Sequence, residues 1–144
     1  MLSKSAARAF FFIGTIGFSV IFLGLTLDTM RQVPKQTNAE NLTPEVIAGK
    51  HLWEKNNCMG CHTILGEGAY YAPELTKSYE RVGPEIIKAI MTSPVPWGPN
   101  GRQMVAYEMT DEEAEAIIAF LKWCGEIDLN GFPPEPDLKP NTSN

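Results

Sequence analysis

The most apolar part of this 144-residue chain lies near its N-terminus, where residues 9–27 contain no charged side chain. A helix of that length, at about 1.5 Å per residue, spans roughly 28 Å, which is close to the thickness of the hydrocarbon core of a bilayer. We therefore predict one transmembrane helix over about residues 9–27.

The charges that flank this segment indicate its orientation. Lys4 and Arg8 precede it without a nearby acid, whereas Asp28 follows it at once and Arg31 and Lys35 come only later. Because basic flanks stay on the cytoplasmic side, we expect a cytoplasmic N-terminus. A cleaved secretory signal usually has a shorter apolar region, about 7–15 residues, and ends in a small-residue cleavage site. The sequence favours an uncleaved anchor, with the rest of the chain on the far side of the membrane.

Beyond the anchor, residues 29–42 are polar, include a proline and show no sustained apolar period, so we predict a linker there. Apolar residues then return at helical spacing in three segments, which cover about residues 44–56, 84–92 and 111–124. Residues 94–101 contain three prolines and two glycines, which is typical of a loop.

Capping signals define the ends of these predicted helices. Thr43 and Pro44 begin the first, Thr110 and Glu113 have capping-box spacing before the last, and Gly125 suits its end. No strand pattern is convincing, so the predicted fold class is all-α. We expect an anchor and the start of a linker in residues 1–35, and a helical head in residues 36–144. The tail from Gly131 has four prolines and is expected to be extended.

The head is acidic, with eight Lys and Arg against sixteen Asp and Glu in residues 36–144, a formal charge of −8. Nucleic-acid binding needs a basic face that neutralises phosphates, so this composition argues against a nucleic-acid partner. A basic protein partner and simple solubility both remain open as reasons for the charge.

The strongest chemical signal is the motif Cys58-Met59-Gly60-Cys61-His62, which has the spacing of covalent haem attachment. Two thiols bond to the haem vinyl groups, and the adjacent histidine binds the iron. A thioredoxin-like dithiol would sit in a βαβ unit, and a structural zinc site would need a second pair of ligands. Neither pattern is present, so we predict one covalently attached haem c with His62 as its proximal ligand.

Cys124 is the third cysteine of the chain, and the haem motif leaves it without a role. It falls within an apolar run of the last predicted helix. We therefore predict a buried, unreactive thiol.

The sixth iron ligand must come from elsewhere in the chain. His51 lies only seven residues before Cys58, in the first predicted helix of the head, and is a poor candidate. Among the six methionines, Met104 and Met109 follow the proline-rich loop and can reach the open haem face. Spacing favours Met104, and a His/Met pair predicts a low-spin iron with a raised reduction potential.

These features resemble those of class I cytochromes c, in which a few helices wrap one haem. The resemblance is carried by the Cys58 to His62 motif, Met104, and the aromatic residues of the last predicted helix. In that family the first and last helices of the domain cross at a small and an aromatic residue. Here these would be Gly49 and either Phe120 or Trp123.

A closer resemblance is to the small cytochrome c subunits of bacterial nitric oxide reductases. It rests on residues 61–75 (CHTILGEGAYYAPEL), 53–57 (WEKNN), 101–102 (GR) and 120–123 (FLKW), together with the anchor. One departure is Val105, because related subunits tend to have proline after the ligand methionine. The resemblance also indicates residues that contact the haem propionates or edge, namely Tyr70, Tyr71, Pro73 and Arg102.

The resemblance implies an anchor in a bacterial inner membrane and a head in the periplasm. It also implies electron transport in a respiratory chain, as part of denitrification. Electrons would come from a soluble cytochrome c or a small copper protein and pass to a large multi-span catalytic subunit with b-type haems and non-haem iron. That partner would convert two NO, two electrons and two protons into N₂O and water. This chain has only two histidines, which is too few for those centres.

Three alternatives remain open at this point. The chain could be a free membrane-anchored cytochrome c, or an electron-transfer subunit of a haem-copper oxygen reductase. It could also be a gas sensor or peroxidase-like protein whose iron has an open sixth position.

Overall fold

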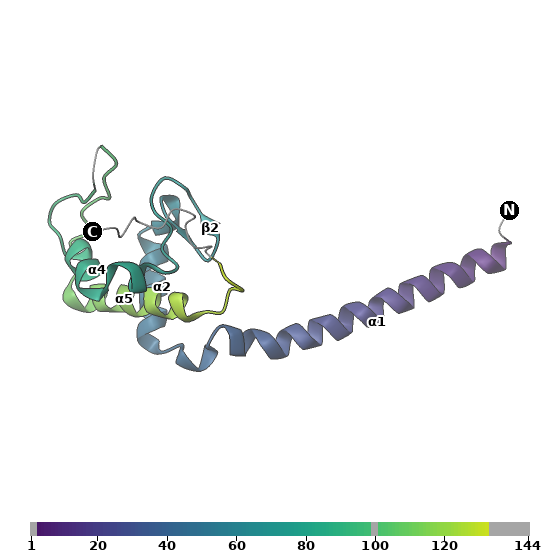
Figure 1. The fold of residues 1–144 in the computed structure, drawn as a ribbon. Helices are drawn as coiled ribbons and strands as arrows, with labels where there is room; N and C mark the ends of the chain where they lie inside the picture. The colour runs from purple at the N-terminus through teal and green to yellow at the C-terminus, as the bar shows by residue number, and fades with distance from the viewer. Residues whose placement is uncertain (1–2, 99–100, 133–144) are drawn as a thin grey trace, which may run out of the picture. The chain divides into compact units, whose positions relative to one another are not determined.

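The computed structural model of this chain describes residues 3–98 and 101–132. The chain divides into two compact units, Met1–Gln36 and Thr37–Asn144. The first contains helix α1 (Lys4–Gln36), and the second contains all the other described elements (Figure 1). The tail that the sequence predicts to be extended lies, from residue 133 onward, outside the described residues.

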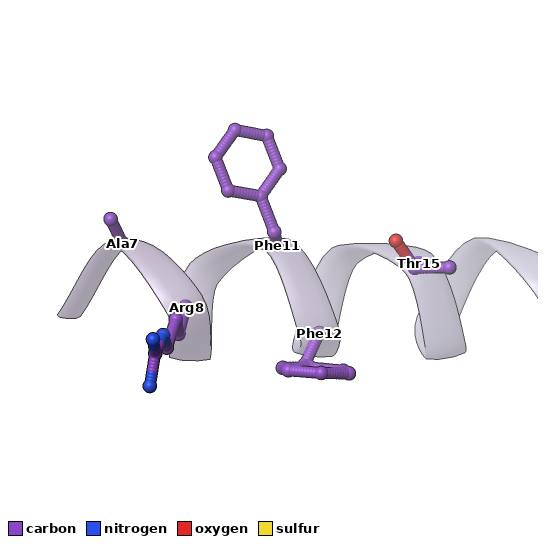
Figure 2. A pocket seen from close by; sticks show the side chains of 5 residues that line it. All are labelled: Ala7, Arg8, Phe11, Phe12 and Thr15. Carbon is purple, nitrogen blue, oxygen red and sulfur yellow. The ribbon is translucent and has the colours of Figure 1, made fainter. Parts of the chain in front are cut away.

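Helix α1 has 33 residues, buries none of them within its own unit, and is long and apolar enough to cross a membrane. This confirms the prediction of one N-terminal apolar helix. Figure 2 shows Phe11 and Phe12 projecting to different sides of the helix, beside Arg8. The shallow depression between them is lined by this single helix, so it is not an enclosed binding site. Such an apolar surface is suited to lipid or to partner helices.

The prediction of a linker over residues 29–42 is wrong for most of that segment, because α1 continues to Gln36. A side-chain pair one turn apart supports the extension, because Gln32 Nε2 donates to Asp28 Oδ2 at 2.5 Å. The Thr29 hydroxyl also donates to the Leu25 carbonyl, which is the geometry of a helical residue. Pro34 lies in the last turn, where its missing N–H removes a single backbone bond. A 3₁₀ turn, η1 (Ala39–Asn41), then leads to the head.

The described part of the head is mostly helical, which confirms the predicted all-α class. Its α-helices are α2 (Pro44–Lys55), α3 (Ser78–Val82), α4 (Pro84–Met91) and α5 (Asp111–Glu126). Three match the predicted segments, whereas α3 is too short to show apolar periodicity. The caps also match: the Thr43 hydroxyl accepts from the Val46 N–H, and Thr110 forms a capping box with Glu113.

The head is organised around the crossing of α2 and α5 (Figure 1). Gly49 of α2 lies against the Ala116 carbonyl and the Phe120 Cβ of α5, so closely that an added Cβ would overlap both. Trp53, one turn further on, packs its ring 5.9 Å from the Phe120 ring. The crossing therefore uses Gly49 and Phe120, as the family resemblance implies.

The C-terminal end of α5 is fixed by side chains from other segments. Asn38 Nδ2 donates to the Glu126 carbonyl at 2.7 Å, and the Trp123 indole N–H donates to the Asn38 carbonyl at 3.3 Å. Lys77 Nζ donates to the Gly125 carbonyl. The expectation that Gly125 ends the helix is wrong: Gly125 is a buried residue of the last turn, where a Cβ would lie 3.1 Å from the Thr76 carbonyl.

A small hairpin follows the predicted haem motif and was not expected from the sequence. It pairs β1 (Thr63–Ile64) with β2 (Glu67–Gly68) in antiparallel register. The connecting residues Leu65 and Gly66 both have positive φ, 52° and 84°. Two-residue hairpin turns of this kind are usually made by Asn-Gly or Asp-Gly, so Leu-Gly does not signal one.

Replacing Gly49 with alanine should destabilise the head, because the new Cβ overlaps the Ala116 carbonyl of α5. We expect the free energy of unfolding to fall by about 1–3 kcal/mol, the usual cost of overpacking, although alanine is the better helix former. Chemical denaturation of the haem-loaded chain measures the change. Ala48→Ser, at the exposed neighbouring position, should change stability by less than about 0.5 kcal/mol. Equal stability of the wild type and Gly49→Ala would contradict this packing.

Candidate haem site

The Cys58 to His62 motif begins directly after α2 and is tightly wound. Asn57 adopts a left-handed conformation with φ of 50°, and the 3₁₀ turn η2 (Cys58–Gly60) follows. The Cys58 carbonyl accepts from both the Cys61 N–H at 3.2 Å and the His62 N–H at 2.9 Å. Both thiols and the imidazole are thus presented from a single turn of backbone.

The segment after the hairpin runs along this motif and satisfies its carbonyl groups. The Ala69 N–H lies 3.0 Å from the Met59 carbonyl and 3.2 Å from the His62 carbonyl, and the Ala72 N–H donates to the Cys61 carbonyl at 2.8 Å. Gly68 lies so close to the His62 carbonyl that a Cβ would overlap it. Residues 68–75, which belong to the segment that carries the closer family resemblance, therefore form a wall along the motif.

The orientation of the His62 ring is set by a backbone carbonyl. His62 Nδ1 lies 2.8 Å from the Pro73 carbonyl oxygen. Because a carbonyl only accepts, Nδ1 is the donor in this contact, and in the neutral imidazole the lone pair then lies on Nε2. The buried Trp53 ring packs against the same imidazole, with 6.4 Å between ring centroids. A neutral imidazole with a free Nε2 is what an iron ligand requires.

The available donors therefore fit a c-type haem. Of the two thiols at the required spacing, one is half-buried and the other exposed, and the adjacent imidazole has its ligating nitrogen unengaged by the Pro73 contact. Within the described residues, the buried indole N–H of Trp53 has no hydrogen-bond partner. An unpaired buried donor beside His62 indicates that a further polar group belongs in this neighbourhood.

The environments of the thiols differ. Burial raises the pKa of Cys58 to about 11, and the hydroxyl of Tyr107 lies beside this sulfur. Tyr107 also donates to the Asn56 carbonyl at 3.4 Å, and its own pKa is raised mainly by burial. Cys61 is exposed. Cys124 is fully buried in the core, as predicted, and burial raises its pKa to about 12.

The two candidate methionine ligands lie in different surroundings. Met104 is half-buried, and its backbone pairs with Trp97 through two hydrogen bonds, of 2.6 and 3.0 Å, which close the proline-rich loop. Met109 is 7% exposed, belongs to the hydrophobic core, and donates its N–H to the Met91 carbonyl at 3.1 Å. The side chain of Met109 is thus used in packing.

Three of the four predicted haem-contact residues are brought into contacts near the motif. The Pro73 carbonyl oxygen accepts the hydrogen bond from His62 Nδ1. The Arg102 guanidinium lies 5.8 Å from the centroid of the Tyr71 ring and 3.4 Å from the Tyr71 carbonyl. Arg102 therefore connects the loop that contains Met104 to the wall of residues 68–75. Tyr70, in contrast, is 86% exposed.

Sequence reasoning missed the residues that support the site from behind. Tyr107 and Thr76 carried no motif signal, and Glu74 was identified only as one position of the segment 61–75, without a role. The side chains of Glu74 and Thr76 bond to each other. Trp53 was identified only through the resemblance, as the first residue of the segment 53–57. These roles depend on contacts between distant segments, which spacing along the chain does not encode.

Comparison with known proteins agrees with the geometry. Residues 46–125 match the cytochrome c family. The C subunit of nitric oxide reductase from Halomonas halodenitrificans is 46% identical over 144 residues, with 94% of this chain and 96% of that protein covered. The chain belongs to the family of nitric oxide reductase C subunits. The relative from Stutzerimonas stutzeri is 39% identical over 140 residues, at the same coverage of both chains.

A shorter likeness exists to cytochrome c oxidase subunit 2 of Alkalihalophilus pseudofirmus, which is 32% identical over 83 residues. It covers 51% of this chain and 24% of that protein. Likeness to the nitric oxide reductase C subunits extends over the anchor as well as the head. Membership of this family accounts for a covalently bound haem c and for a membrane anchor in the apolar helix α1.

Counting reactive thiols tests the attachment and the burial of Cys124 together. In the folded, haem-loaded chain at pH 8, iodoacetamide should modify no cysteine, because two sulfurs are thioethers and the raised pKa keeps Cys124 protonated. In denaturant its pKa returns to about 8.5, and mass spectrometry should find one modified cysteine per chain. Three modified cysteines would contradict covalent attachment, and modification of the folded chain would contradict the burial.

Proposed function

We propose that this chain is the electron-accepting cytochrome c subunit of a nitric oxide reductase, with one haem c bonded to Cys58 and Cys61. His62 is the proximal ligand and Met104 the distal one. Such a haem, when bound, carries one electron at a time. The chain passes electrons from a soluble cytochrome c or small copper protein to a catalytic subunit in the same membrane.

The observation that carries this proposal is the 2.8 Å contact between His62 Nδ1 and the Pro73 carbonyl. It makes Nδ1 the donor and orients the ring, so that Nε2 of the neutral imidazole would be the atom that binds a haem iron, with its electron donation strengthened by the bond at Nδ1. The wall of residues 68–75 covers the backbone of the motif and keeps its carbonyls paired. These are the features of a site that holds its ligands rigidly during electron transfer.

Several contacts support Met104 as the distal ligand. Its backbone is fixed by pairing with Trp97, while its half-buried side chain is available for the iron. Met109 already fills part of the core. If the Met104 thioether and the His62 imidazole both held the iron, no position would be left for a gas molecule, which would suit an electron carrier.

The chemistry on nitric oxide falls to the partner subunit in this proposal. Joining two NO molecules with two electrons and two protons gives N₂O and water, and needs b-type haems and non-haem iron. His51, the second histidine of the chain, lies on the exposed surface of α2 beside Glu54. Helix α1 has no ionisable residue between Arg8 and Asp28 that relays protons, so it serves as an anchor.

The proposed topology is supported by the basic residues before the apolar part of α1. Lys4 and Arg8 lie before its apolar part, which favours a cytoplasmic N-terminus and a periplasmic head. A periplasmic head would meet soluble electron donors directly. Its acidic surface favours a donor with a basic face.

The second candidate is an electron-transfer subunit of an oxygen reductase, which the shorter match to cytochrome c oxidase subunit 2 suggests. That match leaves out about half of this chain, so the nitric oxide reductase assignment has the stronger support. Purification of the native membrane complex separates the two: consumption of nitric oxide favours the first, and consumption of oxygen without nitric oxide activity favours the second.

Met104→Leu should remove the distal ligand while preserving the volume of the side chain. We expect the low-spin spectrum to be lost and the reduction potential to fall, because the thioether sulfur favours the reduced iron. Optical spectra and a redox titration of the full chain measure both effects.

Met109→Leu is the matched control. It should retain the low-spin spectrum and cost less than about 1.5 kcal/mol of stability, as similar-volume substitutions in a core do. If Met109→Leu abolishes the low-spin spectrum and Met104→Leu leaves it intact, the ligand assignment is reversed.

The route of the electrons can be tested in the assembled complex. With a soluble cytochrome c as donor, Met104→Leu should remove most of the nitric oxide consumption. With a small reductant that reaches the catalytic subunit directly, activity should be largely retained. Equal loss with both donors would argue against an electron-accepting role for this chain.

A further inference from the structure

Glu74, the residue after the carbonyl that orients His62, has a carboxylate that the proposed electron transfer does not use. Its Oε1 accepts from the Thr76 N–H at 2.9 Å and also from the Thr76 hydroxyl. Within the described residues, its buried Oε2 has no hydrogen-bond partner. Burying a carboxylate costs free energy, so its presence here needs a reason.

The Thr76 hydroxyl extends this interaction to the hairpin behind the motif. Thr76 is fully buried, and its Oγ1 accepts from the Leu65 N–H at 2.7 Å. Leu65 has a φ of 52°, a left-handed conformation that is unfavourable for a residue with a Cβ. The bond from Thr76 helps to hold this turn, and the Leu75 N–H, which donates to the Thr63 carbonyl at 2.9 Å, aligns the two segments.

Glu74 is therefore held on two sides. Its carboxylate binds Thr76, and its backbone carbonyl accepts from Arg81 Nη2 at 2.7 Å. The carbonyl of Pro73 and the nitrogen of Glu74 belong to the same planar peptide unit. Fixing Glu74 consequently fixes the direction in which the Pro73 carbonyl points, and that direction sets the bond to His62 Nδ1.

We propose that Glu74 is a positioning residue for the iron ligand, and that its carboxylate bond to Thr76 keeps the Pro73 carbonyl aligned with His62 Nδ1. The inference rests on the proposed role of His62 as proximal ligand. It extends that role to a residue that acts on the imidazole only through the Pro73 carbonyl. The basicity of His62, and hence the balance between oxidised and reduced iron, depends on this carboxylate acting as an acceptor.

Two substitutions separate the hydrogen bond from the charge. Glu74→Gln removes the charge but keeps an amide oxygen that can accept from Thr76. Glu74→Leu is also neutral and similar in size but cannot accept. A difference between these two variants therefore reports the hydrogen bond, since both lose the same charge.

The first readout is the solvent exchange of the His62 Nδ1 proton, measured by NMR on the full chain with labelled histidine and bound haem. His51, the other histidine, is exposed and serves as an internal reference. We expect exchange in Glu74→Leu to be about tenfold faster than in Glu74→Gln, which corresponds to the loss of one hydrogen bond. Exchange in Glu74→Gln should remain close to the wild-type rate.

The second readout is a redox titration of the same samples. A weaker hydrogen bond from Nδ1 makes His62 a poorer electron donor to the iron. The reduced iron should therefore become more stable relative to the oxidised iron. At a fixed ambient potential, the ratio of reduced to oxidised chain should be several-fold higher in Glu74→Leu than in Glu74→Gln. A purely structural role of Glu74 would lower thermal stability without this difference.

Thr76→Val and Thr76→Ser provide an independent pair if Glu74→Leu does not load haem. Valine removes the hydroxyl and serine keeps it, so the valine variant should show the faster exchange and the more reduced iron. Equal exchange and equal ratios within each pair that loads haem would overturn the inference.

Failure of the proposed function gives a different result. If His62→Ala keeps the low-spin spectrum, His62 is not the ligand and the proposed site is wrong. Suppose instead that His62→Ala loses that spectrum, while the His62 Nδ1 proton exchanges at the same rate in Glu74→Leu and Glu74→Gln. The ligand assignment then survives, and only the role of Glu74 is overturned.

Discussion

The hydrogen bond from His62 Nδ1 to the Pro73 carbonyl is the interaction on which the proposed site depends. It determines which nitrogen of the ring is protonated and leaves the other for iron. A histidine that follows a cysteine on a tight turn could adopt several ring orientations. The carbonyl selects one of them, and the surrounding structure serves to keep that carbonyl in place.

Two levels of structure maintain this bond. Close by, residues 68–76 run along the motif, pair with its carbonyls and are tied back to the hairpin through Thr76 and Leu65. Further away, the crossing of α2 and α5 at Gly49 places Trp53 against the imidazole. The motif thus lies between a helix pair, which sets its position, and a loop wall, which sets the orientation of His62.

Local signals in the sequence predicted much of this arrangement. Caps and apolar periodicity located α2, α4 and α5, and the Cys58 to His62 spacing indicated the haem. Elements without such signals were missed: α3 is too short, and the hairpin turns at a leucine with positive φ. Residues 29–36 were expected to be a linker because they are polar and contain a proline, but they are helical. A proline in the last turn removes only one backbone hydrogen bond, and a polar composition does not exclude a helix.

The residues behind the site were unpredictable for a different reason. Glu74 and Thr76 are near neighbours in sequence, but their importance comes from Leu65, eleven residues before Thr76. Gly125 looked like a helix stop because glycine is common there, whereas its lack of a Cβ serves close packing against Thr76. Tertiary contacts decide such cases, and the pattern along one segment does not contain them.

If His62 and a second protein ligand both bind the iron of a covalently held haem, no position is left for carbon monoxide. The optical difference spectrum of the reduced full-length chain with added carbon monoxide measures this. We expect a low-spin spectrum that carbon monoxide leaves unchanged, with pigment that acidified acetone does not extract. Rapid binding of carbon monoxide to a high-spin iron would contradict it, and would indicate an open sixth position suited to gas sensing or peroxide chemistry.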